Sequence, residues 1–340
     1  MNADPTQTPD PARIVVERGS AGGIRAVVEA ACTALGTPQS PTLAIVLETT
    51  GSTYVGSGAI ALFAGASQTG WLSGGCLEPE IARRAAQAAK TASIEWMEVD
   101  TRDDEALFGG SAVGCRGRLR LALLPLRALR GWSALAAAWL ARRGPMDISL
   151  SADGKLRCSV DQESANWQLP VGASAWASGP TPPVWQVRIE APPSVLMFGA
   201  GPEAPVLLPL LRSMGWITGV AERRERWMAA SGLADHYFRD APAEVLLQEA
   251  ATGLHAALVM HHNFELDLDA LLALAENPPP FIGLLGPRRR RDDLFRLLPE
   301  SARERLLPTL HSPVGLNLGG RGPEAIALSI AAQLQSKLHD

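Results

Sequence analysis

The chain has 340 residues, 46% of them hydrophobic, and a formal net charge of −4 at pH 7. This length is large for a single core and predicts two domains. The mildly acidic balance argues against a protein that binds the phosphate backbone of nucleic acid. No apolar run reaches the length of about 18 residues expected of a membrane span, and the polar start lacks the features of a signal peptide. We therefore expect a soluble, cytoplasmic protein without a nucleic-acid or membrane partner.

The four cysteines are far apart in the sequence and form no C-x-x-C pair. They are Cys32, Cys76, Cys115 and Cys158. Their spacing predicts neither a structural zinc site nor a disulfide framework. Free thiols in a reducing compartment are the simpler interpretation, and we expect no direct metal site.

The amino-terminal part mixes helical and strand patterns, which predicts an α+β domain over residues 13–143. The predicted elements are a helix over 22–35, strands over 43–47, 58–63 and 70–72, a helix over 79–90, strands over 93–100 and 119–124, and a helix over 128–143. A segment rich in hydroxyls and glycines, residues 48–58, lies between the first two strands. Such a loop, with Gly51, Ser52 and Thr53 at its centre, is suited to an anionic ligand but is equally typical of a tight connection.

The sequence Trp-Leu-Ser-Gly-Gly-Cys-Leu-Glu-Pro-Glu over residues 71–80 is the most distinctive stretch. Gly74 and Gly75 allow positive φ and close backbone approach, and Pro79 opens an alanine-rich helix. Cys76 is therefore expected at a strand-to-helix turn, where the helix amides favour a thiolate. It is a candidate nucleophile or soft ligand, with a small buried hydrophobe as the alternative.

Further polar groups surround this turn in the sequence. Ser73 and Glu78 flank Cys76, and two adjacent glycines with a carboxylate are hard to explain by packing alone. A second glycine cluster over residues 109–117 contains Cys115. The two cysteines could face a common cavity, and the sequence leaves their convergence open.

Residues 144–193 are rich in Pro, Ser and Trp, and we expect a connector or a small subdomain there. Strands and helices then alternate over residues 194–340, which predicts a Rossmann-like, doubly wound parallel sheet. The predicted strands are 194–198, 216–221, 256–260 and 281–285, and the predicted helices are 203–214, 266–275, 289–298 and 322–338.

The turn Gly199-Ala-Gly-Pro-Glu-Ala204 follows the first of these strands and matches G-x-G-x-x-A. Gly199, Gly201 and Ala204 are thus candidates to cradle a pyrophosphate. The acidic residue expected about 20 residues later is Glu222, one place late, and Arg223 could instead receive a 2′-phosphate. The sequence leaves two interpretations open: the domain binds NAD(P), or it has kept the fold and lost the dinucleotide.

Four later residues are candidates for a second site at the carboxyl ends of the predicted strands. They are His261, Arg288, His311 and Asn317. The simpler interpretation of the arginine run that begins at residue 288 is a solvated helix start. No metal-ligand spacing surrounds His261.

The chain resembles the XdhC/CoxI family of accessory proteins for molybdenum hydroxylases such as xanthine dehydrogenase. The matching segments occur in the family's order over nearly the whole chain. They are Glu48-Thr-Thr-Gly-Ser-Thr53, Gly58-Ala59, Ser73-Gly-Gly-Cys-Leu-Glu78, Gly114-Cys115, Gly199-Ala-Gly201, Ile282-Gly-Leu-Leu-Gly286, His311-Ser-Pro-Val-Gly-Leu-Asn317 and Pro323-Glu-Ala-Ile-Ala-Leu-Ser329.

The resemblance implies a chaperone rather than a housekeeping oxidoreductase, and leaves open whether the protein is also an enzyme. Such a protein binds the molybdenum cofactor, molybdopterin, supports its sulfuration by a cysteine desulfurase and delivers it to the apo-enzyme. The resemblance makes Cys76 the main cofactor contact and Cys115 a supporting one. The other candidate cofactor-binding residues are Ser73, Gly74, Gly75, Glu78, Gly51, Ser52 and Thr53.

The sequence also departs from the family at three places. Val55-Gly-Ser57 stands where a basic residue is common, Arg116 interrupts a Gly-Cys-Gly-Gly turn, and Ala221 stands where an aspartate is expected. Two alternatives are an NAD(P)-dependent oxidoreductase that uses the Gly199-Ala-Gly201 turn, and a scaffold that bridges the apo-enzyme and the desulfurase. The sequence leaves open whether the protein forms a homodimer.

Overall fold

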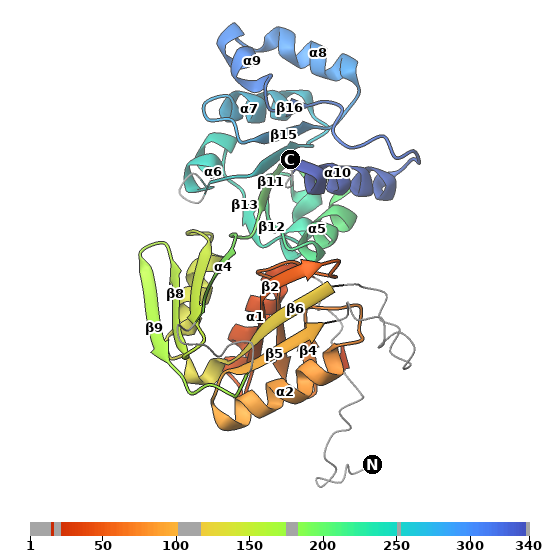
Figure 1. The fold of residues 1–340 in the computed structure, drawn as a ribbon. Helices are drawn as coiled ribbons and strands as arrows, with labels where there is room; N and C mark the ends of the chain where they lie inside the picture. The colour runs from red at the N-terminus through yellow and green to blue at the C-terminus, as the bar shows by residue number, and fades with distance from the viewer. Residues whose placement is uncertain (1–14, 17–21, 101–116, 175–182, 250–252, 338–340) are drawn as a thin grey trace, which may run out of the picture. The chain divides into compact units, whose positions relative to one another are not determined.

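The computed structural model divides the chain into two compact units, Met1–Ala191 and Pro192–Asp340 (Figure 1). Each unit has its own sheets and its own hydrophobic core. The residues that the structure describes are 15–16, 22–100, 117–174, 183–249 and 253–337.

The first unit is built on a six-stranded sheet in the order β1-β4-β3-β2-β6-β5. Its strands are β1 (Val15–Val16), β2 (Thr42–Gly51), β3 (Ile60–Ala64), β4 (Ser67–Thr69), β5 (Glu95–Asp100) and β6 (Gly117–Pro125). Strand β2 is antiparallel to β3 and β6, which are antiparallel to β4 and β5 respectively. Strands β2, β4 and β5 therefore run in one direction and end at the same edge of the sheet.

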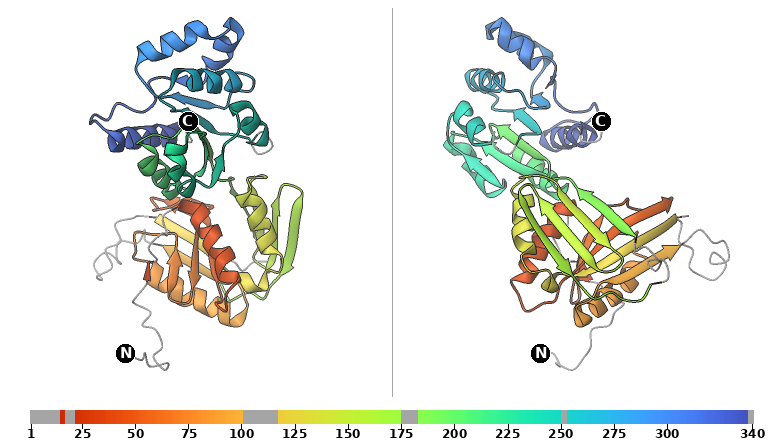
Figure 2. Two further views of the ribbon diagram at one scale, coloured as in Figure 1. Left: turned by 180° about the vertical axis from the view of Figure 1, so that it is seen from behind. Right: turned by 60° about the vertical axis from the view of Figure 1, so that its left-hand side comes forward.

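Helices cover both faces of this sheet. Helix α2 (Glu78–Thr91) is alanine-rich and packs on one face through Ile81 and Ala85, which lie four residues apart and so share one side of the helix. Helices α1 (Gly23–Leu35) and α4 (Trp132–Leu140) pack side by side into the core on the other face (Figure 2).

Residues 144–193 contain a four-stranded antiparallel sheet in the order β10-β7-β8-β9. Its strands are β7 (Met146–Ser151), β8 (Lys155–Val160), β9 (Glu163–Gln168) and β10 (Val184–Ile189). Side chains alternate between buried and more exposed along β7, β8 and β10, so one face packs inward. That face belongs to the same core as α1 and α4. The Trp139 indole of α4 donates to the Ile189 carbonyl oxygen at 3.2 Å.

The second unit is a six-stranded, all-parallel sheet in the order β13-β12-β11-β14-β15-β16. Its strands are β11 (Ser194–Phe198), β12 (Ile217–Ala221), β13 (His236–Phe238), β14 (Ala256–Val259), β15 (Phe281–Leu284) and β16 (Leu310–His311). The order reverses between β11 and β14, which is the topology of a Rossmann domain. The predicted fold class is therefore confirmed: antiparallel sheets come first and a parallel Rossmann-like sheet follows.

Helices cover both faces of the parallel sheet, as the fully buried central strands require. On one face lie α5 (Ala204–Ser213) and α10 (Pro323–Lys337), which pack together. On the other lie α6 (Pro242–Glu249), α7 (Phe264–Leu274), α8 (Arg288–Leu297) and α9 (Glu300–Leu306). The part of the chain that the structure describes also contains two 3-10 segments, η1 (Leu126–Ala128) and η2 (Glu225–Gly232).

The predicted strand over 70–72 was wrong. Ser67–Thr69 forms the strand, because Ala64 pairs with Ser67 and leaves a two-residue hairpin turn. Gly65 adopts the positive φ of 62° that such turns favour. The apolar residues that suggested a strand begin the loop before α2.

The predicted helix over 128–143 is shorter in the structure. Gly131 has a φ of 85° and interrupts the helical backbone, so that α4 begins at Trp132. The sequence analysis also missed short elements with weak periodicity, namely β13, α6, α9 and β16.

Gly70, directly after β4, provides a test of the close packing in the first unit. Its φ is +85°, and a Cβ there would lie 2.7 Å from Val27 Cγ2 and 2.9 Å from the Ile60 carbonyl oxygen. We expect Gly70→Ala to lower the free energy of unfolding by about 2–4 kcal/mol, measured by urea denaturation. In the matched control Gly74→Ala the new Cβ meets nothing within 4 Å, so a change within about 0.5 kcal/mol is expected. Equal effects of the two substitutions would contradict this account.

Candidate functional site

The loop between β4 and α2 presents an accessible thiol. Of the three cysteines that the structure describes, Cys32 is half-buried, Cys158 is buried and Cys76 is exposed. Burial raises the pKa of Cys158 to about 12, so its thiol stays protonated. Cys76 is thus the described cysteine that is open to a ligand or reactant.

A fully buried carboxylate holds this loop in place. Glu78, the first residue of α2, accepts hydrogen bonds through Oε1 from the backbone N–H groups of Leu72 at 3.1 Å and Ser73 at 2.8 Å. Its Oε2 accepts from the Ser73 hydroxyl. Within the described residues no cation pairs with Glu78, so these donors offset the cost of burying the carboxylate.

Ser73 links the Glu78 carboxylate to the part of the loop that carries the thiol. Its Oγ accepts from the backbone N–H groups of Gly75 at 3.2 Å and Leu77 at 3.1 Å, and lies 3.7 Å from Cys76 Sγ. Leu77 is the residue just before α2, so this hydroxyl binds an N–H at the helix start. Ser73 and Glu78 are both buried and turned into the loop.

The outer surface of the loop is formed by the glycines, the thiol and an aromatic ring. Gly74, Gly75 and Cys76 are all exposed. Gly75 has a φ of +102°, and a Cβ there would lie 4.0 Å from the indole ring of Trp71, which is 41% exposed. The exposed thiol therefore lies in a hydrogen-bonded loop whose neighbouring Gly75 faces an accessible aromatic ring.

The hydroxyl-rich loop after β2 leaves toward the same edge of the sheet. Its Val55 packs against the hydrophobic cluster on the α2 face that also contains Leu72 and Leu77 of the cysteine loop. The two loops are thus anchored on one core. Tyr54 at the tip of the first loop is 61% exposed.

The residues predicted to bind an anion in this loop are accessible. Gly51 and Ser52 are exposed, and Thr53 is half-buried and donates through Oγ1 to the Val55 carbonyl oxygen at 2.8 Å. Gly117 of β6 packs against this segment so closely that a Cβ would lie 2.6 Å from Thr53 Cγ2. Cys115 and Arg116, the other predicted features of that glycine cluster, lie outside the described residues.

In the second unit, the predicted dinucleotide turn contacts the end of β14. Gly199 has a φ of +88°, and a Cβ there would lie 2.5 Å from the Cα of His261. Gly201 leaves room for the carboxylate of Glu203 and for the ring of His262. Ala204 is buried and begins α5. These contacts within the domain require the small residues of the turn.

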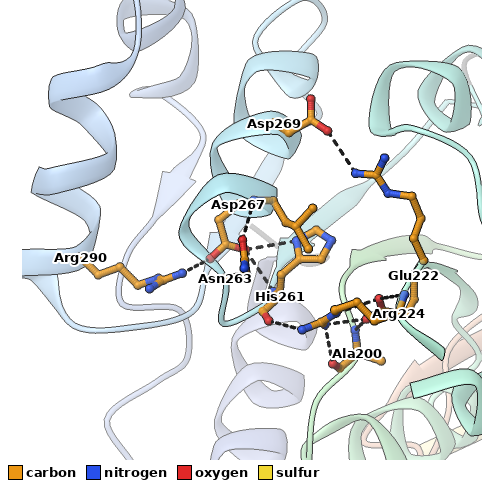
Figure 3. Close-up of polar contacts among 10 residues, drawn as sticks. Ala200, Glu222, Arg224, His261, Asn263, Asp267, Asp269 and Arg290 are labelled. Carbon is orange, nitrogen blue, oxygen red and sulfur yellow. Dashed lines mark hydrogen bonds and ion pairs between the residues drawn. The ribbon is translucent and has the colours of Figure 1, made fainter. Parts of the chain in front are cut away.

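Glu222, predicted to bind a ribose, is instead enclosed by the domain (Figure 3). Its side chain accepts from the Ala200 N–H at 2.8 Å and from the Arg224 guanidinium, with Arg224 Nη2 2.6 Å from Oε2. Burial raises the pKa of Glu222, but these hydrogen bonds outweigh it and hold the pKa below its ordinary value. The carboxylate is 1% exposed, and it is not accessible to a ribose.

Arg224 and its neighbours join several strands at the carboxyl edge of the sheet. The guanidinium donates to the carbonyl oxygens of Ala200 at 3.0 Å and His261 at 2.7 Å. The buried Asp267 accepts from the His261 N–H at 3.1 Å, and on its other oxygen from Arg290 at 2.6 Å. Figure 3 shows this chain of contacts running from Ala200 to Arg290.

A second acid–base pair lies over the glycine-rich turn. Glu203 Oε2 is 3.5 Å from His262 Nε2; the Glu203 side chain is 6% exposed and that of His262 is 50% exposed. The hydrogen bond from His262 lowers the pKa of Glu203, and its own backbone N–H adds to this. In return Glu203 raises the pKa of His262. His262 has a φ of 55°, which is uncommon for a residue with a side chain.

The other predicted residues of this unit do not form one cluster with His261. Arg223 reaches Asp269 at 3.4 Å, and Arg288 is exposed, so Arg290 is the arginine that joins the His261 network. His311 stacks on Phe281 with ring centroids 4.4 Å apart, and burial lowers its pKa. Asn317 lines a separate cavity of about 340 Å³ between the end of β15 and the start of α10.

Five side chains of these networks were absent from the predicted site: Glu203, Arg224, His262, Asp267 and Arg290. Glu203 lies inside the predicted turn, and Arg224, His262 and Arg290 are each within two residues of a predicted one. For these four the position in the sequence was a usable signal, whereas Asp267 lies further along the chain. Among the described residues no group of three or more His, Cys, Asp and Glu side chains could hold a metal ion, and no helix is long and apolar enough to cross a bilayer.

The fold and these loops define an α/β protein with a Rossmann domain whose glycine-rich turn contacts its own side chains. Residues 195–334 match the family model described as the XdhC Rossmann domain, and residues 25–98 match the model of the XdhC and CoxI family. The chain belongs to the XdhC/CoxI family, which confirms the resemblance seen in the sequence.

Two relatives are similar over most of the chain. A Bacillus subtilis (strain 168) protein, named as a probable xanthine dehydrogenase subunit, is 26% identical over 86% of this chain and 91% of its own length. The crystal structure of a xanthine dehydrogenase from Bacillus halodurans is 26% identical, with a TM-score of 0.74 over 92% of this chain and 95% of that one. The Escherichia coli (strain K12) "Uncharacterized protein YqeB" is 39% identical over 20% of this chain and 13% of its own.

The buried carboxylate of Glu78 should be essential to the cysteine loop. We expect Glu78→Ala to lower the free energy of unfolding by about 2–4 kcal/mol, because the Leu72 and Ser73 N–H groups lose their buried acceptor. Urea denaturation measures this. The control Glu80→Ala removes a more exposed carboxylate of the same helix turn, which pairs with Arg83, and should cost less than about 1 kcal/mol. If the two variants were equally stable, Glu78 would not organise the loop.

The Glu203–His262 pair should make stability depend on pH. Because the pKa of Glu203 is lowered from its ordinary value of 4.5, the ionised carboxylate stabilises the fold above pH 4.5. This contribution is lost as the pH falls through the lowered pKa. Because the pKa of His262 is raised from its ordinary value of 6.5, the protonated imidazole stabilises the fold below pH 6.5. This contribution is lost as the pH rises through the raised pKa. The loss of Tm in Glu203→Gln should therefore be largest between pH 4.5 and 6.5 and smaller at alkaline pH.

The nearby charges Asp267 and Arg290 act on His262 in opposite directions, so the pair with Glu203 should dominate this profile. Glu265→Gln, an exposed position at the start of α7, is the control and should give a small change at every pH. A Tm loss in Glu203→Gln that does not vary with pH would contradict the ion pair.

Proposed function

We propose that this protein binds the molybdenum cofactor, supports its sulfuration and delivers it to a molybdenum hydroxylase such as xanthine dehydrogenase. The exposed thiol of Cys76 is the proposed main contact. Membership of the XdhC/CoxI family and the names of the relatives support a role associated with xanthine dehydrogenase. The hydroxylase apo-enzyme and a cysteine desulfurase are the proposed partners.

The observation that carries the proposal is the exposed Cys76 thiol in a loop held by internal hydrogen bonds. Sulfur is a soft ligand that suits molybdenum and sulfur chemistry. The neighbouring glycines leave the thiol open to a bulky ligand, and the exposed Trp71 ring beside Gly75 offers a flat surface for a pterin. Ser73 and Glu78 would act by holding the loop, since their polar atoms are engaged inside it.

The cofactor's phosphate would be held by the second loop of the same unit. Ser52 is exposed there and offers a hydroxyl donor, beside the exposed Gly51 that ends β2. Both loops pack on one hydrophobic cluster, which supports a shared ligand. Cys115 is proposed as a further contact on the grounds of its sequence position.

The alternative of an NAD(P)-dependent oxidoreductase is less well supported by the geometry. The ribose-binding carboxylate of that scheme, Glu222, is enclosed by Arg224, and Glu203 lies over Gly201. An enzyme of that class needs both places for its dinucleotide. We therefore favour cofactor delivery over hydride transfer.

Purification from cells that make the molybdenum cofactor tests the proposal. Molybdenum and oxidised pterin are measured in the wild type, in Cys76→Ser and in the control Cys32→Ser, which changes a half-buried thiol of α1. We expect Cys76→Ser to retain at most about a tenth of the wild-type cofactor, as for the loss of a metal-site contact. Cys32→Ser should retain as much cofactor as the wild type. Cys115→Ser should show a smaller loss.

Two outcomes would contradict the proposal. Equal cofactor in the wild type and in Cys76→Ser would leave Cys76 without a binding role. Co-purification of an apo-hydroxylase with no pterin in any variant would favour a scaffold that bridges the hydroxylase and the desulfurase.

A further inference from the structure

The place where a Rossmann domain holds a pyrophosphate is occupied here by a side chain of the protein. In such domains the second glycine of the turn lets the pyrophosphate approach the backbone at the helix start. At Gly201, the corresponding position, a Cβ would lie 2.7 Å from Glu203 Oε2. The space that this glycine clears is therefore filled by a carboxylate.

The carboxylate is held there by several contacts. Glu203 is 5% exposed and precedes the first turn of α5. It pairs with His262, and its own backbone N–H helps to keep it ionised. An anion at a helix amino terminus is favoured by the helix dipole, so Glu203 provides the negative charge that a phosphate would otherwise supply.

The backbone donors of this turn are also depleted. Pro202 and Pro205 have no N–H group. The N–H of Gly199 donates to the Ala221 carbonyl oxygen at 2.9 Å, and that of Ala204 to the Gly201 carbonyl oxygen at 3.1 Å. The Ala200 N–H is bound by Glu222. A phosphate-bearing ligand at this turn would thus find few unused N–H donors, and it would meet the negative charge of Glu203.

We propose that Glu203 is a built-in substitute for a ligand's phosphate, and that its carboxylate excludes phosphate-bearing nucleotides from the glycine-rich turn. The inference concerns the second unit and does not depend on cofactor binding by Cys76. It makes Glu203 the residue that separates this domain from a nucleotide-binding one, with His262 as the hydrogen-bond partner that holds it in place.

Titration calorimetry with ADP, NADH and inorganic pyrophosphate tests the proposal on the full-length protein. We expect weak or no binding to the wild type and a gain of roughly tenfold or more in affinity for Glu203→Ala, because one negative charge beside the phosphate is removed. His262 would then be available to the phosphate, so adding His262→Gln should reduce the gain. Glu265→Ala, which removes an acid from the start of α7, should bind like the wild type.

The isosteric variant Glu203→Gln guards against a folding failure of Glu203→Ala, and the NMR titration of His262 reports on both. A downward shift of the His262 pKa in a folded variant shows that the pair is broken. The proposal is overturned if the wild type binds these ligands as tightly as the variants. It is overturned equally if a folded variant with the shifted His262 pKa gains no affinity.

Discussion

The first unit depends on the burial of one carboxylate that, among the described residues, has no cation beside it. Glu78 begins α2 and collects two backbone N–H groups and a hydroxyl from the loop that precedes it. An unsatisfied buried charge would be costly, so the loop has one arrangement that serves all three donors. In that arrangement Ser73 binds the next amides in turn, and Cys76 is left on the outside. The hydrogen bonds inside the loop thus turn its polar groups inward and leave the thiol on the surface.

In the second unit, buried carboxylates fill positions where a ligand could bind, whereas in the first unit a buried carboxylate leaves a thiol exposed. Glu222 and Glu203 lie at the two places where a dinucleotide would contact a Rossmann domain, and each is paired with a base, Arg224 or His262. Their contacts join β11, β12 and β14 at the carboxyl edge of the sheet. The glycines of the turn remain necessary because the domain's own groups approach them closely. A nucleotide-binding motif can therefore persist for packing within the domain.

Much of the fold could be predicted because long apolar runs and strongly periodic helices determine strands and helices locally, as for β11 and α2. The four-stranded sheet over 146–189 could not, since strands such as β9 carry many polar residues and are recognised by pairing. At the site, the glycine and cysteine pattern pointed to Cys76. The pairing of Glu203 with His262 was hidden, because only tertiary structure brings His262 from the end of β14 to the start of α5.

The most direct measurement of the central claim is the rate at which iodoacetamide alkylates Cys76, followed by mass spectrometry with and without added molybdenum cofactor. An exposed thiol that contacts the cofactor should react readily alone and much more slowly with the cofactor present, while the half-buried Cys32 reacts at the same rate in both. Equal rates at Cys76 under both conditions, with cofactor bound, would contradict the account.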